Sequence, residues 1–358
     1  MDLENKISAR EILGRIRNLV LFLFVHYKKL RKTKPTKPVI FFELEDNYWH
    51  RYLLILCHFF ENKGFQIIIM PKLKFMSNWA TLALADQLPD VKFQSTTHFE
   101  LCISSKLKKR KNTKHLFTDY FQPQISSDAF KIPMPMVDTM YKLGYYKKSK
   151  ALSTQEKRNI KIFYVGNINK GHNTPTILEC FNILDRNQII DIITRNFADS
   201  IAKPPGSDIE MLNMKAEIVI FDRKELNIRP EMLLEALANC QFILGPPGVV
   251  MPQTHFIVEA MSVGCIPIIE FPEIFDTPLD DSNSVIFDGE TDLKEKIKYV
   301  LSLPDDRIRE MHTNVIQFYD DHLSIDAVVG NILNPRYQSL FLNCENYSVQ
   351  QMNNVRRD

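Results

Sequence analysis

The chain has 358 residues, enough for two domains of ordinary size, and its net charge is only +2. Apolar residues make up 45% and charged residues 25%. This balance supports folded hydrophobic cores and excludes a chain that is disordered because it has too few apolar residues. The charge is uneven. Residues 1–38 hold ten Lys or Arg against three Asp or Glu, a charge of +7, so the other 35 basic and 40 acidic residues give −5. This asymmetry predicts that the N-terminal segment meets an anionic surface.

Residues 1–38 are predicted to form an arm containing an amphipathic helix with a basic rim. Its apolar residues recur at helical spacing: Ile12, Leu13, Ile16, Leu19, Val20 and Leu23. Such a helix can lie in a membrane interface, so we expect residues 1–34 to contact an anionic membrane. Docking on the body of the protein, or in a dimer, is the alternative. The apolar run 19–25 is too short to span a bilayer, and basic residues flank it without a cleavage site, which argues against a secretory signal.

The six cysteines are widely spaced, with no CxxC pair and no Cys/His ligand spacing. Most of them lie in apolar runs. This pattern is typical of buried free thiols in a reducing compartment, and it predicts neither a zinc site nor a disulfide framework.

Strand and helix signals alternate from residue 39 onward, which predicts a parallel α/β domain over 39–146. Strands are expected at 39–42, 65–70, 91–93 and 101–104, and helices at 49–62 and 79–87. Prolines then cluster at Pro123, Pro133 and Pro135. The polar stretch 147–158 that follows is predicted to be a linker.

A second alternation predicts another α/β domain over 159–334, followed by a polar tail over 335–358. Strands are expected at 160–165, 189–193, 217–221, 242–244, 266–269 and 285–287, and helices at 175–184, 230–238, 254–263, 292–301 and 305–319. Two such domains would place a cleft between the carboxyl ends of their strands, where open α/β sheets bind ligands.

The segment 242–271 carries the clearest chemical signal. A strand runs into a turn containing Gly245 and Gly248, and a helix starts near Thr254 with unpaired N–H groups that suit a diphosphate. Glu259 falls on the face of His255, four residues on. Its carboxylate could accept two ribose hydroxyls while His255 donates to a phosphate oxygen. A well-capped strand–helix–strand unit without a ligand is the alternative.

This segment resembles the donor-site motif of GT-B glycosyltransferases, particularly the exostosin-like group. The matching residues are Gly248, Glu259-Ala260 and the run Gly264-Cys265-Ile266-Pro267-Ile268-Ile269. The motif covers about thirty residues, and the two-domain pattern covers roughly 39–330. The resemblance implies two Rossmann-like domains facing a cleft, a nucleotide-sugar donor, a ribose-binding role for Glu259 and no essential metal.

Two departures from the family pattern bear on mechanism. The basic residue that many relatives carry before the Glu is absent, unless His255 replaces it. Met251 stands where the first Glu of the Glu-x7-Glu pair of many retaining members would be. We therefore expect inversion of the anomeric configuration.

Further donor-site candidates follow other predicted strands. Gly166-Asn167 comes after the strand 160–165, in the loop that approaches the donor phosphates in GT-B proteins; a plain turn is the alternative. Arg195 and Arg223 also follow predicted strands. Either could clamp a diphosphate through two N–H groups, or form a surface salt bridge.

Catalytic candidates lie after the first strand of the N-terminal domain, in Glu43, Glu45, Asp46 and His50. A carboxylate or imidazole there could deprotonate an acceptor hydroxyl. Capping of the following helix by Asp46 is the alternative role, and Asp119 is the second choice for the base.

These features predict a glycosyltransferase that moves a sugar from a nucleotide-sugar to a glycan or lipid-linked acceptor. We expect it to act in cell-surface polysaccharide or glycolipid assembly, as a cytoplasmic protein peripheral on the inner face of the membrane. A sugar-nucleotide epimerase of the same fold is one alternative, and a non-enzymatic nucleotide- or polyanion-binding module is another. Nucleic acid is not expected as a partner, because the basic stretches lack interleaved aromatic residues.

Overall fold

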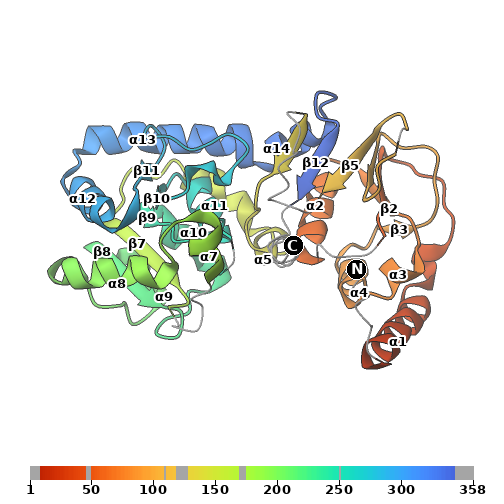
Figure 1. Ribbon diagram of the computed structural model, residues 1–358, viewed down its shortest axis with the longest axis horizontal. Helices are drawn as coiled ribbons and strands as arrows, with labels where there is room; N and C mark the ends of the chain where they lie inside the picture. The colour runs from red at the N-terminus through yellow and green to blue at the C-terminus, as the bar shows by residue number, and fades with distance from the viewer. Residues whose placement is uncertain are drawn as a thin grey trace. The chain divides into compact units, whose positions relative to one another are not determined.

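The computed structural model describes residues 9–45, 50–108, 110–117, 128–168, 175–249 and 251–342 (Figure 1). These residues divide into two compact units. Unit 1 contains the described residues up to Ile132 and those from Val329 onward, and unit 2 runs from Pro133 to Val328. The predicted α/β class with two parallel sheets is confirmed, because each unit is built on one sheet of parallel strands.

The sheet of unit 1 has seven strands in the order β3-β2-β1-β4-β5-β12-β6. The strands are β1 (Val39–Glu43), β2 (Gln66–Ile69), β3 (Lys92–Phe93), β4 (Leu101–Ser104), β5 (Thr113–Phe117), β6 (Ala129–Ile132) and β12 (Ser339–Leu342). The helices are α1 (Ala9–Val25), η1 (Tyr27–Leu30), α2 (His50–Asn62), α3 (Leu73–Met76) and α4 (Trp79–Gln87). Every residue of β1 is buried, as expected for a central parallel strand covered on both faces.

The chain order within this sheet creates a topological switch point. From β1 the chain adds β2 and β3 on one side and then returns to place β4 on the other side of β1. The loops after β1 and β4 therefore leave the sheet in opposite directions. Such a point opens a crevice at the carboxyl edge, where open α/β sheets bind ligands.

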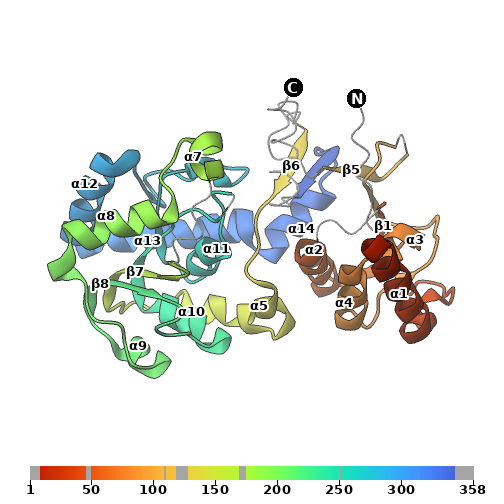
Figure 2. The ribbon, with the colours of Figure 1, turned by 60° about the horizontal axis from the view of Figure 1, so that its bottom comes forward.

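Helix α1 belongs to unit 1 and is not the separate arm that was predicted. Phe22 is fully buried and packs edge-on against Phe93, with ring centroids 4.8 Å apart. Asn18 donates from Nδ2 to the carbonyl oxygen of Ser77 at 3.3 Å. Lys29 then donates to two carbonyl oxygens at the end of α4. Figure 2 shows α1 beside α3 and α4, which it contacts.

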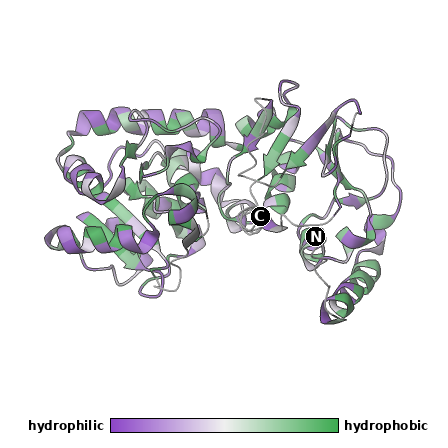
Figure 3. Cartoon of the chain, in the orientation of Figure 1, coloured by the Kyte–Doolittle hydropathy of each residue, from purple (hydrophilic) through white to green (hydrophobic). Residues whose placement is uncertain are grey.

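The sheet of unit 2 has five parallel strands in the order β11-β10-β9-β7-β8. They are β7 (Ile160–Gly166), β8 (Ala216–Asp222), β9 (Cys240–Leu244), β10 (Ile266–Ile269) and β11 (Val285–Ile286). The helices are α5 (Asp138–Lys142), η2 (Tyr145–Lys148), α6 (Ser149–Leu152), α7 (Pro175–Phe181), α8 (Arg186–Asn196), η4 (Ala198–Ser200), α9 (Asp208–Asn213), α10 (Pro230–Ala238), α11 (His255–Ser262), η5 (Pro272–Ile274), α12 (Gly289–Ser302), α13 (Asp305–Phe318), η6 (Tyr319–Leu323) and α14 (Ile325–Leu333). Its switch point lies between β7 and β9. The strands of both sheets are mainly hydrophobic (Figure 3).

The predicted linker 147–158 does not join the two units, because the whole stretch lies in unit 2 and its first half folds into η2 and α6. Nε2 of His312 in α13 lies 3.0 Å from the carbonyl oxygen of Ser153, and Lys150 pairs with Asp320 at 3.2 Å. The observed divisions fall between Ile132 and Pro133 and within α14.

Two further sequence predictions need correction. The expected strand 189–193 lies inside α8, which Asp185 and Gln188 start with a reciprocal capping box. The expected tail contributes β12, which pairs with β5 on one side and β6 on the other. The short apolar run of β12 finds its partners more than 200 residues earlier in the chain, so no local signal marks it.

Candidate functional site

The candidate donor site lies at the switch point of unit 2. Gly166 ends β7 and is followed by Asn167, while Gly245 directly follows β9. Both loops therefore start from the strands between which the chain reverses direction. The predicted strand ends are confirmed here, and the arrangement is the one in which open α/β sheets bind ligands.

Arg186 joins these two loops, a role that the sequence did not suggest. Its Nε and Nη2 donate to the carbonyl oxygen of Pro247 at 3.3 and 3.1 Å, and its Nη1 donates to that of Asn167 at 3.2 Å. The side chain is half-buried in the first turn of α8. The pattern of residues 189–193 predicts a strand, so it does not place Arg186 at the start of a helix. The Asp185/Gln188 capping pair is the signal that could have revealed it.

The glycines of both loops are required by close contacts. A Cβ at Gly248 would lie 2.9 Å from the carbonyl oxygen of Met251 and 3.0 Å from that of Gln253. A Cβ at Gly166 would lie 2.1 Å from the hydroxyl oxygen of Tyr164, a buried side chain that folds back over the glycine. Packing thus accounts for Gly166 even without a ligand.

The loop after β9 leads into α11, whose N-terminus carries no side-chain cap. Thr254 is the N-cap residue with extended backbone, but its side chain makes no capping hydrogen bond. No acidic residue lies in the first turn. The first N–H groups of the helix therefore keep their capacity to bind an anion.

Glu259 and His255 both bind the segment 135–137. The N–H of Val137 donates to Oε1 of Glu259 at 3.0 Å, and Nδ1 of His255 donates to the carbonyl oxygen of Pro135 at 2.6 Å. Since Nδ1 carries the proton, Nε2 of a neutral His255 is an acceptor, and only the imidazolium form donates to phosphate. Burial raises the pKa of Glu259 to about 7, and the Val137 hydrogen bond and the charge of Arg223 oppose this shift.

The two predicted clamping arginines differ in position. Arg223 directly follows β8, and its N–H donates to the carbonyl oxygen of Gly166 at 3.0 Å. Its charge also acts on Glu259, which keeps it in the site. Arg195 is exposed in the last turn of α8, where its Nε donates to the carbonyl oxygen of Asp191. The predicted place of Arg195 at a strand end is therefore wrong.

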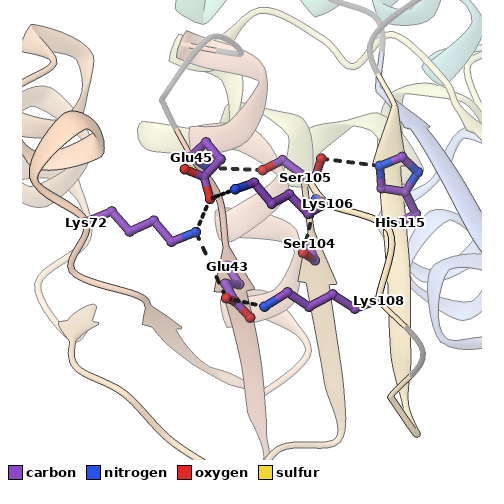
Figure 4. A network of polar contacts seen from close by, with 8 residues as sticks. All are labelled: Glu43, Glu45, Lys72, Ser104, Ser105, Lys106, Lys108 and His115. Carbon is purple, nitrogen blue, oxygen red and sulfur yellow. Dashed lines mark hydrogen bonds and ion pairs between the residues drawn. The ribbon is translucent and has the colours of Figure 1, made fainter.

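In unit 1, a cluster of carboxylates and ammonium groups occupies the switch point between β1 and β4 (Figure 4). Glu43 pairs with Lys108, and Glu45 pairs with both Lys72 and Lys106. The N–H of Glu45 also donates to Oγ of Ser105 at 3.0 Å. The loops after β1, β2 and β4 thus meet through charged side chains.

This pairing weakens Glu45 as the predicted base. The hydrogen bond from Lys72, with a second from Lys106, lowers the pKa of Glu45 against the opposing effect of burial. A carboxylate with a lowered pKa takes a proton less readily. Asp46, the side chain of His50 and Asp119 lie outside the described residues.

Among the described residues, no group of three or more His, Cys, Asp or Glu side chains is placed to hold a metal ion. Five cysteines of this part of the chain are free, and burial raises the pKa of four of them. These are Cys57, Cys102, Cys240 and Cys265. Their thiols are therefore poor nucleophiles.

Two parallel α/β units with polar switch points define a two-unit, Rossmann-like protein. No family model and no curated protein matches the sequence. Among solved structures the chain is similar to Anabaena HepE in complex with UDP and glucose, at 8% identity and a TM-score of 0.41, over 83% of this chain and 98% of that one. It is also similar to a sucrose-phosphate synthase from Thermosynechococcus elongatus, at 9% identity and a TM-score of 0.33, over 90% and 98% of the two chains. A third similar structure is the wall teichoic acid polymerase TagF, at 13% identity and a TM-score of 0.26, over 90% and 94%. Likenesses this distant assign no ligand to this chain.

Proposed function

We propose that this protein is a GT-B glycosyltransferase that binds a nucleotide-sugar in unit 2 and transfers the sugar to a glycan or lipid-linked acceptor. The observation that carries the proposal is the switch point between β7 and β9. Two glycine-containing loops meet there, Arg186 bridges them, and the uncapped N-terminus of α11 follows directly. A phosphate group is the ligand that best fits this combination of N–H donors and cationic charge.

The donor would use the residues of this site as follows. Its diphosphate would take N–H groups from the start of α11 and charge from Arg186 and Arg223. Its ribose hydroxyls would donate to the carboxyl group of Glu259, as the GT-B resemblance implies. A cationic His255 would add a donor from Nε2, because Nδ1 is already engaged with Pro135.

The chemical step would be a direct displacement with inversion. The acceptor hydroxyl oxygen attacks the anomeric carbon, and the bond from that carbon to the diphosphate oxygen breaks. The electron pair leaves with the diphosphate, whose charge the donor-site groups stabilise without an essential metal. The hydroxyl proton passes to a base of unit 1, among Glu43, Glu45, Asp46 and His50. The lowered pKa of Glu45 counts against it as this base.

We place this reaction in the assembly of cell-surface polysaccharide or glycolipid, on the cytoplasmic face of the membrane. The +7 charge of residues 1–38 supports that location, because the surface of the cytoplasmic leaflet is negative.

A thermal-shift panel of UDP-, GDP-, CMP- and dTDP-sugars tests the proposal. A ligand that binds only the folded state raises the unfolding temperature, so one nucleotide series should stand out. Incubation of that donor with acceptor should then release nucleoside diphosphate. If no nucleotide-sugar raises the unfolding temperature, the proposal is wrong. Conversion of the donor sugar to its epimer without an acceptor would identify an epimerase instead.

A further inference from the structure

Helix α1 turns most of its large apolar side chains outward, unlike an ordinary surface helix. Its buried residues are Asn18 and Phe22. Its exposed face carries an unbroken set of large apolar residues at helical spacing: Ile12, Leu13, Ile16, Val20, Leu23 and Phe24. Phe24 is 82% exposed. A helix that served only to cover the body would turn its apolar stripe inward, whereas the described part of the chain leaves this stripe uncovered.

The inward face of α1 is fixed by specific contacts. Besides Phe22 and Asn18, His26 donates from Nε2 to Asp86 at 3.2 Å, and Lys29 donates to the carbonyl oxygens of Leu88 and Pro89. These bonds set the rotation of the helix about its axis. The outward stripe is therefore held in place before any partner binds.

Two more exposed apolar residues begin elements that α1 contacts. Leu73 begins α3 and Trp79 begins α4, and both elements contact α1. Their side chains are 67% and 62% exposed. Tryptophan is enriched where a protein meets the interface of a bilayer, because its ring has an apolar body and a polar N–H. Figure 3 shows α1 as a largely hydrophobic helix.

Exposed basic residues are frequent on α1 and in the segment that follows it. Arg10 and Arg17 are exposed on α1, and the segment that follows carries further exposed Lys and Arg: Lys28, Arg31, Lys32, Lys34 and Lys37. The rest of the chain has a charge of −5, so the net positive charge lies in the segment that contains α1. Anionic lipid complements this combination, because the acyl boundary takes the apolar stripe and the headgroups take the basic rim.

We propose that this face, formed by the outward side chains of α1, docks unit 1 on an anionic lipid bilayer. The proposal goes beyond sugar transfer and does not depend on it. Among the described residues, no helix is long and apolar enough to cross a membrane. Removal of the whole segment is a poor test, since it would expose the core around Phe22 and Phe93.

The test is co-sedimentation of the full chain with vesicles made of equal parts phosphatidylglycerol and phosphatidylcholine, at low salt. The variant Ile16→Gln with Val20→Gln removes two outward side chains, and glutamine is at least as good a helix former as either. We expect wild type to bind these vesicles, to bind pure phosphatidylcholine more weakly and to be released by salt. The double variant should bind at least about tenfold more weakly.

A matched control is available in unit 2. Leu178 on α7 and Ile209 on α9 are 55% and 61% exposed, against 55% and 60% for Ile16 and Val20. Leu178→Gln with Ile209→Gln should bind vesicles like wild type. Replacement of Arg31 and Lys32 by Gln should weaken binding by about fivefold per charge. Equal unfolding midpoints verify that the variants fold. If the Ile16/Val20 variant does not fold, Leu13→Gln with Phe24→Gln takes its place.

Three results would overturn the proposal. The wild type could fail to bind the anionic vesicles, or the Ile16/Val20 variant could bind as well as the Leu178/Ile209 control. Alternatively, sedimentation velocity could show a lipid-free dimer that the Ile16/Val20 variant abolishes while its vesicle binding is unchanged. In that case a second copy of the chain covers the face.

Discussion

Arg186 holds the loops after β7 and β9 together through three N–H groups of one planar side chain. A lysine keeps the charge but cannot present three fixed donors, so Arg186→Lys should let the two loops separate. We predict that this variant stays folded and binds the donor nucleotide-sugar about tenfold more weakly, corresponding to about 1.4 kcal/mol. Isothermal titration calorimetry measures this directly.

Arg195 provides the control on the same helix. It is exposed, and its Nε donates to the carbonyl oxygen of Asp191 one turn earlier. Arg195→Lys should therefore leave donor affinity unchanged. Equal losses in the two variants would mean that charge on α8, and not the bridge between the loops, governs binding.

The buried carboxyl group of Glu259 should make the free energy of unfolding depend on pH. Burial raises its pKa from 4.5 to about 7, so the folded chain holds a proton that the unfolded chain loses at lower pH. Stability should fall as the pH rises through this window, because the folded state binds more protons there. Glu259→Gln keeps an acceptor for the N–H of Val137 and removes the charge. We predict that it is more stable than wild type above pH 7, by about 3 kcal/mol at most, and similar near pH 4.5.

Urea unfolding over this pH range measures the effect in the absence of ligand. Glu295→Gln on the exposed surface of α12 is the matched control and should show no such pH-dependent gain. A gain of equal size at every pH would point to packing instead of charge burial.

At the residue scale, the sequence could mark positions that a local pattern requires. Gly248, Gly166 and Glu259 follow from strand–turn–helix order. The structure places both glycines in the loops of one switch point, and Glu259 in the helix that follows the loop of Gly248. The contact of Glu259 with Val137 could not be predicted, because 122 residues separate them. The role of Arg186 could not be predicted for a different reason. The β-branched isoleucines after it favour a strand locally, whereas in unit 2 they pack as a helix.

Among the elements, the turn between β9 and α11 depends on a residue without a side chain. The N–H of Gly248 donates to the carbonyl oxygen of Met251 at 2.8 Å, and a Cβ would press on that same oxygen. Gly248→Ala should open this turn and shift the start of α11. We predict a loss of donor affinity of about tenfold or more, with the far-ultraviolet spectrum of the protein unchanged. Calorimetry of donor binding checks this.

Gly330 in α14 supplies the comparison, because a Cβ there would meet nothing within 4 Å. Gly330→Ala should stabilise the chain by about 0.5–1 kcal/mol through its helix propensity and leave donor affinity intact. If Gly248→Ala binds the donor like wild type, the turn is not part of the site.

The strongly patterned elements were predictable and the short ones were not. Continuous apolar runs such as β1 and β7 mark central parallel strands wherever they occur. The elements α6 and β12 span only four residues each, so neither shows a full period of its pattern. Helix α6 depends on contacts such as that between His312 and Ser153, the residue after the helix, and β12 depends on its pairing with β5. Only the folded chain brings these partners near one another.

For the molecule as a whole, the predicted boundaries between the units differ from the observed ones. Composition along the chain does not show which segments pack into the same unit. The polar stretch 147–158 looks like a linker, but Lys147, Lys148 and Lys150 lie on the exposed sides of short helices, while Ser149 and Ser153 are buried. The true divisions lie beside Pro133 and inside α14, and unit 1 needs chain from both sides of unit 2. Unit 2 is continuous from Pro133 to Val328, so its contacts can form without either flank.

This connectivity predicts different fates for fragments of the chain. Without residues after 328, unit 1 loses β12, and β6 is left without its neighbouring strand. Phe130 also loses its ring contact with Tyr337, and the buried Nζ of Lys114 loses the carbonyl oxygen of Asn334 at 2.6 Å. Burial lowers the pKa of Lys114 to about 8, and the fragment would lack the carbonyl oxygen that accepts from its Nζ.

We therefore predict that a fragment of residues 133–328 folds cooperatively and binds the donor, whereas residues 1–132 alone do not fold. Joining residue 132 to 329–342 through a flexible linker should restore a cooperative transition to unit 1, because it returns β12 to the sheet. Denaturant unfolding followed by circular dichroism distinguishes the three fragments. A cooperative transition in 1–132 alone would show that β12 adds to a sheet that is already stable. Failure of 133–328 to fold would show instead that unit 2 needs its flanks.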